Sequence, residues 1–142
     1  MISYQKQWEF LKRKFEVGQL AHAYLFSGQE LESVKFFAKD FIRLINCSSP
    51  KPHGREILGI SKMPCGECQN CRMIEREAFP DLLTIKSSDS ESSIKNEKDM
   101  MEISIEQVRK AQNFLSYKSY YGNFKSVIIE NAEKMTFEAQ NC

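Results

Sequence analysis

Four of the five cysteines in this 142-residue chain fall close together, in the segment CSSPKPHGREILGISKMPCGECQNC. Two residues separate Cys65 from Cys68, and two more separate Cys68 from Cys71. Cysteines at that spacing can turn their sulfurs toward one tetrahedral ion about 2.3 Å away. The pattern therefore predicts a closed, structural zinc site with four thiolate ligands and no open position for water chemistry. The predicted ligands are Cys47, Cys65, Cys68 and Cys71.

Other readings of the cysteine segment remain open. His53 could replace Cys47 as the fourth ligand. A ferredoxin-type iron–sulfur run would need another cysteine soon after the third, and Glu75 and Arg76 occupy that region. The plain alternative is a group of free thiols, but cysteines clustered so tightly in a reducing compartment favour a metal.

The composition bounds the setting of this site. Hydrophobic residues make up 42% of the chain and charged residues 27%, and the net charge of +1 demands no polyanionic partner. No apolar run approaches the roughly 20 residues that a membrane span needs. The first residues, MISYQKQWEFLKRK, lack the apolar core of a signal peptide. We therefore expect a cytoplasmic protein of about one domain, with no membrane association.

A second candidate site begins at Gly28, which ends the run AHAYLFSG. A phosphate-binding loop reads G-x-x-x-x-G-K-[ST]; its backbone N–H groups and lysine hold the phosphates, and its hydroxyl holds magnesium. Laid on that pattern from Gly28, the last three positions are Ser33, Val34 and Lys35. The lysine position is apolar, and a shift of one residue would swing Lys35 by about 100° around a helix. We expect a degenerate phosphate loop that is kept as a turn and does not bind ATP.

The elements that position these residues follow from apolar periodicity and from turn signals. Alternating strands and helices predict an α/β fold with a largely parallel sheet. The last strand is continuous enough to be buried on both faces. The expected helices cover 4–15, 31–45 and 73–78, and the expected strands cover 23–26, 80–86 and 124–130.

The C-terminal part of the chain carries clear helix starts. Ser104 and Gln107 form a capping-box pair, and Ile103 and Val108 suit the hydrophobic staple around it. A further helix opens at Thr136. The polar, serine-rich residues 87–99 lie between the strand expected over 80–86 and the helix that starts at Ser104. We expect them to form a mobile surface loop.

Three segments together resemble the family of delta-prime subunits of the bacterial DNA polymerase III clamp loader. They are AHAYLFSGQE, PCGECQNCRMIEREAFPDLLTI and ISIEQVRKAQNFLSYKSYYGNFKSVIIENAEKMTFEAQNC. The glycine loop alone is a weak signal. The cysteine spacing, placed between that loop and the strand VIIENAEKM, is the specific one.

The resemblance implies a RecA-like AAA+ module, in which helices flank a largely parallel sheet in three layers. The zinc-binding insertion would occupy residues 47–71. Residues 1–142 would form a truncated, partial domain of this type, and its helical lid and C-terminal collar would lie outside the chain. A Ser-Arg-Cys motif, whose arginine serves a neighbouring subunit's ATP site, would also lie outside it.

The resemblance also points to a second damaged element. In active AAA+ ATPases the strand ends in Asp-Glu, for magnesium and for orienting water, whereas this chain has Glu130 and Asn131. Two damaged elements are typical of the non-hydrolysing, stator-like subunit, so we expect no catalytic residue and no intrinsic ATPase activity. The alternatives are an active gamma/tau-type clamp-loader ATPase and a zinc-containing module that binds nucleic acid.

The same resemblance implies the partners. They would be gamma/tau and delta subunits in a hetero-pentamer that loads the sliding clamp during DNA replication. The clamp and primer-template DNA would be reached indirectly, through that complex. Structural Zn²⁺ is the one cofactor expected.

Overall fold

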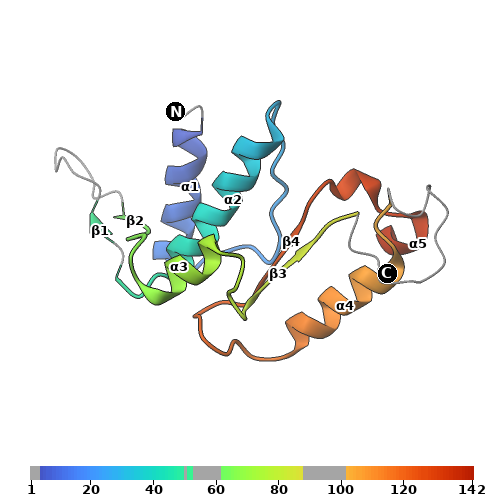
Figure 1. Ribbon diagram of the computed structural model, residues 1–142. Helices are drawn as coiled ribbons and strands as arrows, with labels where there is room; N and C mark the ends of the chain where they lie inside the picture. The colour runs from blue at the N-terminus through green and yellow to red at the C-terminus, as the bar shows by residue number, and fades with distance from the viewer. Residues whose placement is uncertain (1–3, 50, 53–61, 88–101) are drawn as a thin grey trace. The chain divides into compact units, whose positions relative to one another are not determined.

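The computed structural model describes residues 4–49, 51–52, 62–87 and 102–142 (Figure 1). The chain divides into two compact units, Met1–Phe79 and Pro80–Cys142, and each is described by itself. The expected mobile loop over 87–99 lies outside the described residues apart from Ser87, and His53 lies outside them as well.

The described residues of the first unit form helices α1, α2 and α3 and a short strand pair. Helices α1 (Gln5–Glu16) and α2 (Leu31–Asn46) confirm the predicted helices. Helix α3 (Gln69–Glu75) begins four residues earlier than the predicted residue 73 and ends before residue 78. Strands β1 (Lys51–Pro52) and β2 (Lys62–Met63) pair antiparallel within the cysteine segment.

An aromatic-rich core fills the first unit. Leu11 of α1 and Phe41 of α2 are buried at its centre, and Trp8 packs edge-on against Phe41 with ring centroids 6.5 Å apart. Edge-on packing of this kind is the favoured geometry for aromatic pairs. The apolar faces of α1 and α2 therefore pack against each other. The remaining core members are Leu44 and Ile45, with Phe15, Leu20, Tyr24, Phe26 and Phe37 packed against them.

The strand predicted over 23–26 is wrong. Tyr24 and Phe26 pack into the core while Leu25 between them is 86% exposed, so the side chains alternate as they would in a strand. A strand also requires a backbone hydrogen-bond ladder with a neighbour. No ladder joins this segment to another segment of the described chain. The apolar run therefore fixes which side chains face inward but forms no sheet there.

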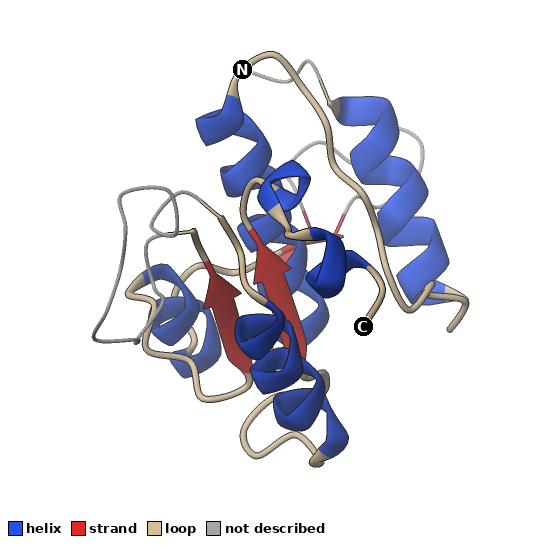
Figure 2. Ribbon diagram, turned by 90° about the vertical axis from the view of Figure 1, so that its right-hand side faces the viewer, coloured by secondary structure: helices blue, strands red, loops and turns tan. Residues whose placement is uncertain are grey.

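The second unit contains the parallel sheet. Strands β3 (Leu82–Ile85) and β4 (Ser126–Ile129) pair in parallel from Leu82↔Ser126 to Ile85↔Ile129, and Figure 2 shows their arrows pointing the same way. This pairing confirms both predicted strands. All four β4 residues are half-buried, so the prediction that this strand is buried on both faces is wrong. The described residues thus give a mixed α/β protein with a small parallel sheet.

Helix α4 (Ile105–Ser116) packs on that sheet and connects its strands. The predicted capping box is confirmed: Gln107 N donates to Ser104 Oγ at 3.4 Å, and Ser104 N donates to Gln107 Oε1 at 2.9 Å. Ile103 is fully buried and Val108 packs against the same cluster, as the staple requires. The unit ends with the 3₁₀ turn η2 (Ala132–Lys134) and helix α5 (Phe137–Gln140), whose N-cap is Thr136 as predicted.

A buried carboxylate fixes the connection from α4 to β4. Asp81, which is fully buried, accepts backbone N–H bonds from Tyr120 at 2.6 Å, Tyr121 at 2.5 Å and Gly122 at 2.7 Å. Burial alone would raise its pKa, but these donors and the nearby charge of Lys125 outweigh it, and the net effect lowers the pKa of Asp81. Asp81 is therefore an ionised anchor for this loop.

None of the described helices is long and apolar enough to cross a membrane.

Candidate metal centre and glycine turn

The four predicted cysteine ligands meet at one point of the first unit. Cys47 is the C-cap residue of α2, Cys68 is the N-cap residue of α3, and Cys71 lies in the first turn of α3. Cys65 precedes them on the segment after β2. The four Sγ atoms all lie within 4.8 Å of one another. The two helix ends therefore bring together residues that are far apart in the sequence.

The spacing of the sulfur atoms fits one tetrahedral ion. Ligands about 2.3 Å from such an ion stand about 3.8 Å from each other, and the Sγ atoms of Cys47 and Cys68 are 3.9 Å apart. Backbone N–H groups point at the sulfurs: Cys65 N donates to Cys47 Sγ at 3.4 Å, and Cys68 N donates to Cys65 Sγ at 3.2 Å. Donors of this kind stabilise thiolates. The donor set and its geometry could hold a metal ion.

The thiols of the cluster differ in acidity. Burial opposes ionisation of Cys68, but donors from Cys71 N–H and from Ser48 lower the pKa of this thiol to about 6. Burial raises the pKa of Cys71 to about 12, and the sulfurs of Cys68 and Cys47 add to that rise. Burial likewise raises the pKa of Cys47. Because metal ligation requires thiolates, binding at neutral pH would release protons from the cluster.

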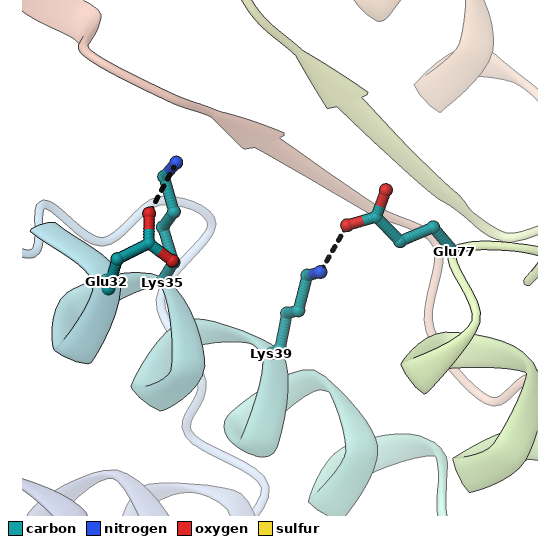
Figure 3. A network of polar contacts seen from close by, with 4 residues as sticks. All are labelled: Glu32, Lys35, Lys39 and Glu77. Atoms are coloured by element: carbon teal, nitrogen blue, oxygen red, sulfur yellow. Dashed lines mark hydrogen bonds and ion pairs between the residues drawn. The ribbon is translucent and has the colours of Figure 1, made fainter.

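Polar contacts join α3 to α2 around the cysteines. Asn70 Nδ2 donates to the Asn46 carbonyl at 2.9 Å. Lys39 of α2 forms an ion pair with Glu77, just after α3 (Figure 3). Gly66 has a φ of +73°, a conformation that favours glycine, and it lies between the ligand candidates Cys65 and Cys68.

Two side chains pack against the glycine turn before α2. A Cβ atom at Gly28 would stand 2.7 Å from the hydroxyl oxygen of Tyr4 and 2.8 Å from Cγ2 of Val34. Both distances are shorter than the non-bonded contacts that real Cβ atoms make, so a neighbouring atom would have to shift. Tyr4 and Val34 therefore close directly on the Gly28 backbone.

The other loop positions pair with acidic neighbours. The Ser33 hydroxyl donates to Glu30 Oε2 at 3.0 Å, and Lys35 Nζ lies 3.4 Å from Glu32 Oε1 (Figure 3). Glu30 is the N-cap residue of α2, and Glu32 lies in its first turn. The partly positive end of the helix, where a phosphate would bind, thus carries two carboxylates.

The predicted acidic positions follow β4 in the second unit. Glu130 N donates to the Ile85 carbonyl at 2.9 Å and so extends the ladder beyond β4. Asn131 has φ +54° and ψ +55°, and its carbonyl accepts from Lys134 N at 2.8 Å. Asparagine tolerates this left-handed conformation well, so Asn131 has a structural role as the start of η2. The two groups of predicted nucleotide positions belong to different units.

Sequence patterns give little indication of the role of three residues at these sites. Tyr4 begins the helix predicted over 4–15, but nothing in that pattern brings its hydroxyl to Gly28. Glu30 belongs to no motif that marks it as the N-cap residue of α2. Arg43 lies against the cysteine turn, and only its four-residue spacing from Cys47 could have suggested this.

The fold and the site together define a small α/β protein with a four-cysteine cluster between α2 and α3 and a glycine turn before α2. The family described as "DNA polymerase III, delta subunit" matches residues 3–142. The chain therefore belongs to this family, which confirms the resemblance to clamp-loader subunits.

Individual relatives carry two kinds of name. The chain is 31% identical over 123 residues to the DNA polymerase III subunit tau/gamma of Haemophilus influenzae, which covers 87% of this chain and 15% of that protein. It is 27% identical to the DNA polymerase III subunit delta' of Pseudomonas aeruginosa, and the match covers 87% of this chain and 32% of that protein. It is 28% identical to the delta' subunit of Bacillus subtilis, with 94% of this chain and 34% of that protein covered. The chain thus spans about a third or less of the length of these relatives.

Proposed function

We propose that this chain is part of a non-hydrolysing, stator-like subunit of the DNA polymerase III clamp loader. The observation that carries the proposal is the closure of Tyr4 and Val34 on Gly28. In a working phosphate loop the backbone at this turn must stay open to the phosphates. Here a phenol hydroxyl and a valine methyl pack against the Gly28 backbone instead.

Electrostatics support the same proposal. A triphosphate needs a lysine on its β and γ oxygens, and Val34 occupies that position. Lys35 instead pairs with Glu32, and Glu30 caps the helix with a second carboxylate. These carboxylates would repel a triphosphate at the helix end that normally attracts it.

The cysteine cluster is proposed as a structural zinc centre held by Cys47, Cys65, Cys68 and Cys71. Four thiolates leave no coordination position for water or substrate, so the ion would serve the fold and not a reaction. Its contribution would be to fix the N-terminus of α3 at the C-terminus of α2. The zinc-binding insertion over 47–71 and the partial RecA-like AAA+ domain over 1–142 belong to this proposal.

An active tau/gamma-type ATPase is the rival function, and the similarity to a tau/gamma subunit favours it. That function would have to use Lys35 as the phosphate lysine and Glu130 as the metal carboxylate. Lys35 is already paired with Glu32, and the Glu130 backbone is held in the ladder by its N–H bond to the Ile85 carbonyl. We also propose that the partners of this chain are gamma/tau and delta subunits. The clamp and primer-template DNA would be reached indirectly, through that complex.

The test is the ATPase rate of a clamp loader reconstituted with this subunit and with tau/gamma and delta subunits. Substituting Lys35→Met or Glu130→Gln in this subunit should leave the steady-state rate unchanged, because neither side chain would touch ATP. Corresponding changes in the tau/gamma subunits of the same assembly provide the positive control. A tenfold loss of rate from either substitution here would favour the rival.

A further inference from the structure

Arg43 places its guanidinium beside the turn between Cys65 and Cys68. It precedes Cys47 by four residues on α2, so the two side chains lie on the same face of the helix, one turn apart. Its Nη2 stands 3.5 Å from the place where a Cβ of Gly66 would be. The guanidinium therefore lies against the turn that carries Cys65 and Cys68.

Among the described residues, a carboxylate pairs with one end of this cation. Asp40 Oδ1 accepts a hydrogen bond from Nη1 at 3.1 Å, and the Asp40 side chain is 42% exposed whereas that of Arg43 is 20% exposed. Nε is buried and has no hydrogen-bond partner within the described ranges. Asp40 thus pairs with one nitrogen of the guanidinium at the surface and does not surround it.

The chemistry of the cluster explains the need for a cation. Four thiolates around a divalent ion carry two net negative charges, and partial burial makes that charge costly. Cys47 and Cys71 are the buried members of the cluster. A fixed positive charge on the adjoining turn would lower this cost.

We infer that Arg43 is a positioning residue of the metal centre, which holds the Gly66 turn and balances the charge of the thiolates. The inference rests on the proposed zinc centre. Groups around metal ligands commonly change metal affinity by about 10- to 100-fold when removed. Arg43 should act in this way through its charge and its contact with the turn.

The experiment measures zinc affinity of the 142-residue chain by competition with a chromophoric chelator. Arg43→Gln should weaken zinc binding by roughly tenfold or more. Arg43→Lys should retain most of the affinity because it keeps the charge. Asp40→Asn is the matched control: it breaks the same ion pair but leaves the cation on the turn, so affinity should stay within about twofold of the natural chain.

Each outcome decides the inference. Unchanged affinity in Arg43→Gln overturns it, and so does an equal loss in Asp40→Asn, because the ion pair and not the cation would then matter. If Arg43→Gln fails to fold, the decision falls to Arg43→Lys. A zinc affinity in Arg43→Lys as low as that of the unfolded Arg43→Gln chain contradicts the charge argument. If the natural chain binds no zinc, the zinc centre itself fails, which is a distinct result. Cobalt substitution, read by its thiolate charge-transfer bands, checks that all variants keep the ligand set.

Discussion

The Cγ2 methyl of Val34 closes on the Gly28 backbone so tightly that a Cβ atom at Gly28 would stand 2.8 Å from it. Val34 occupies the position that a lysine holds in a phosphate-binding loop. The glycine is therefore required at this turn by the packing of neighbouring side chains. The presence of glycine at position 28 is therefore explained without a bound phosphate.

Gly28→Ala tests this packing. The added methyl must displace Val34 or the Tyr4 hydroxyl, and overpacking of this kind costs about 1–3 kcal/mol. We expect the free energy of unfolding, measured by urea denaturation, to fall by that amount. The turn needs no left-handed backbone at Gly28, so backbone strain would not contribute to the loss, and the alanine's effect on the unfolded chain acts in the opposite direction.

A rescue background provides the control for Gly28→Ala. Tyr4→Phe removes the hydroxyl and Val34→Ala removes the methyl that the new Cβ would meet. In the chain carrying both changes, Gly28→Ala should cost less than about 0.5 kcal/mol, because the contacts no longer exist. An equal cost in both backgrounds would show that the turn is not closed by these side chains.

Cys68→Ser tests the metal centre. One thiolate fewer should abolish the closed site, so zinc measured by atomic emission in the purified chain should fall from about one ion per chain to well below it. Cys142→Ser is the matched control, since Cys142 is exposed and lies outside the cluster. A metal content unchanged by Cys68→Ser would contradict the ligand set.

Asp81→Asn should destabilise the second unit. The substitution places an amide where an ionised carboxylate accepts three backbone N–H groups, and the expected loss in unfolding free energy is about 2–4 kcal/mol. The exposed Glu133→Gln should cost far less. Equal losses in the two variants would show that Asp81 anchors nothing.

The Asp81 contribution should also depend on pH. The folded pKa of this carboxyl is lowered, so its stabilisation is fully present above the unfolded value of about 3.9 and is lost as the pH falls through the folded value. The stability gap between the natural chain and Asp81→Asn should therefore narrow in acid below about pH 4. A gap that widens on acidification would contradict the lowered pKa.

Local patterns were sufficient for the helices. The stripe of α2 and the capping box of α4 depend on neighbouring residues only, and the structure confirms both. The helix predicted over 73–78 was misplaced because α3 is capped by Cys68, whose sulfur accepts the Cys71 N–H at 3.5 Å. Cysteine is not a usual N-cap residue, so this start had no sequence signal.

Contacts between distant residues could not be predicted in the same way. The segment 23–26 has a strand-like pattern, but a strand forms only with a backbone partner, which the pattern cannot supply. The cysteine cluster was foreseeable because ligand spacing is itself the signal. The approach of Tyr4 to Gly28 and of Arg43 to Gly66 depends on helix packing, which single-sequence periodicity does not encode.

The most direct test of the proposed function is equilibrium binding of Mg-ATP to this chain, measured by isothermal titration calorimetry. We predict no saturable binding up to millimolar nucleotide, because the turn is closed and the helix end carries carboxylates. Lys35→Met should give the same flat titration. Micromolar binding that requires magnesium and disappears in Lys35→Met would contradict the account.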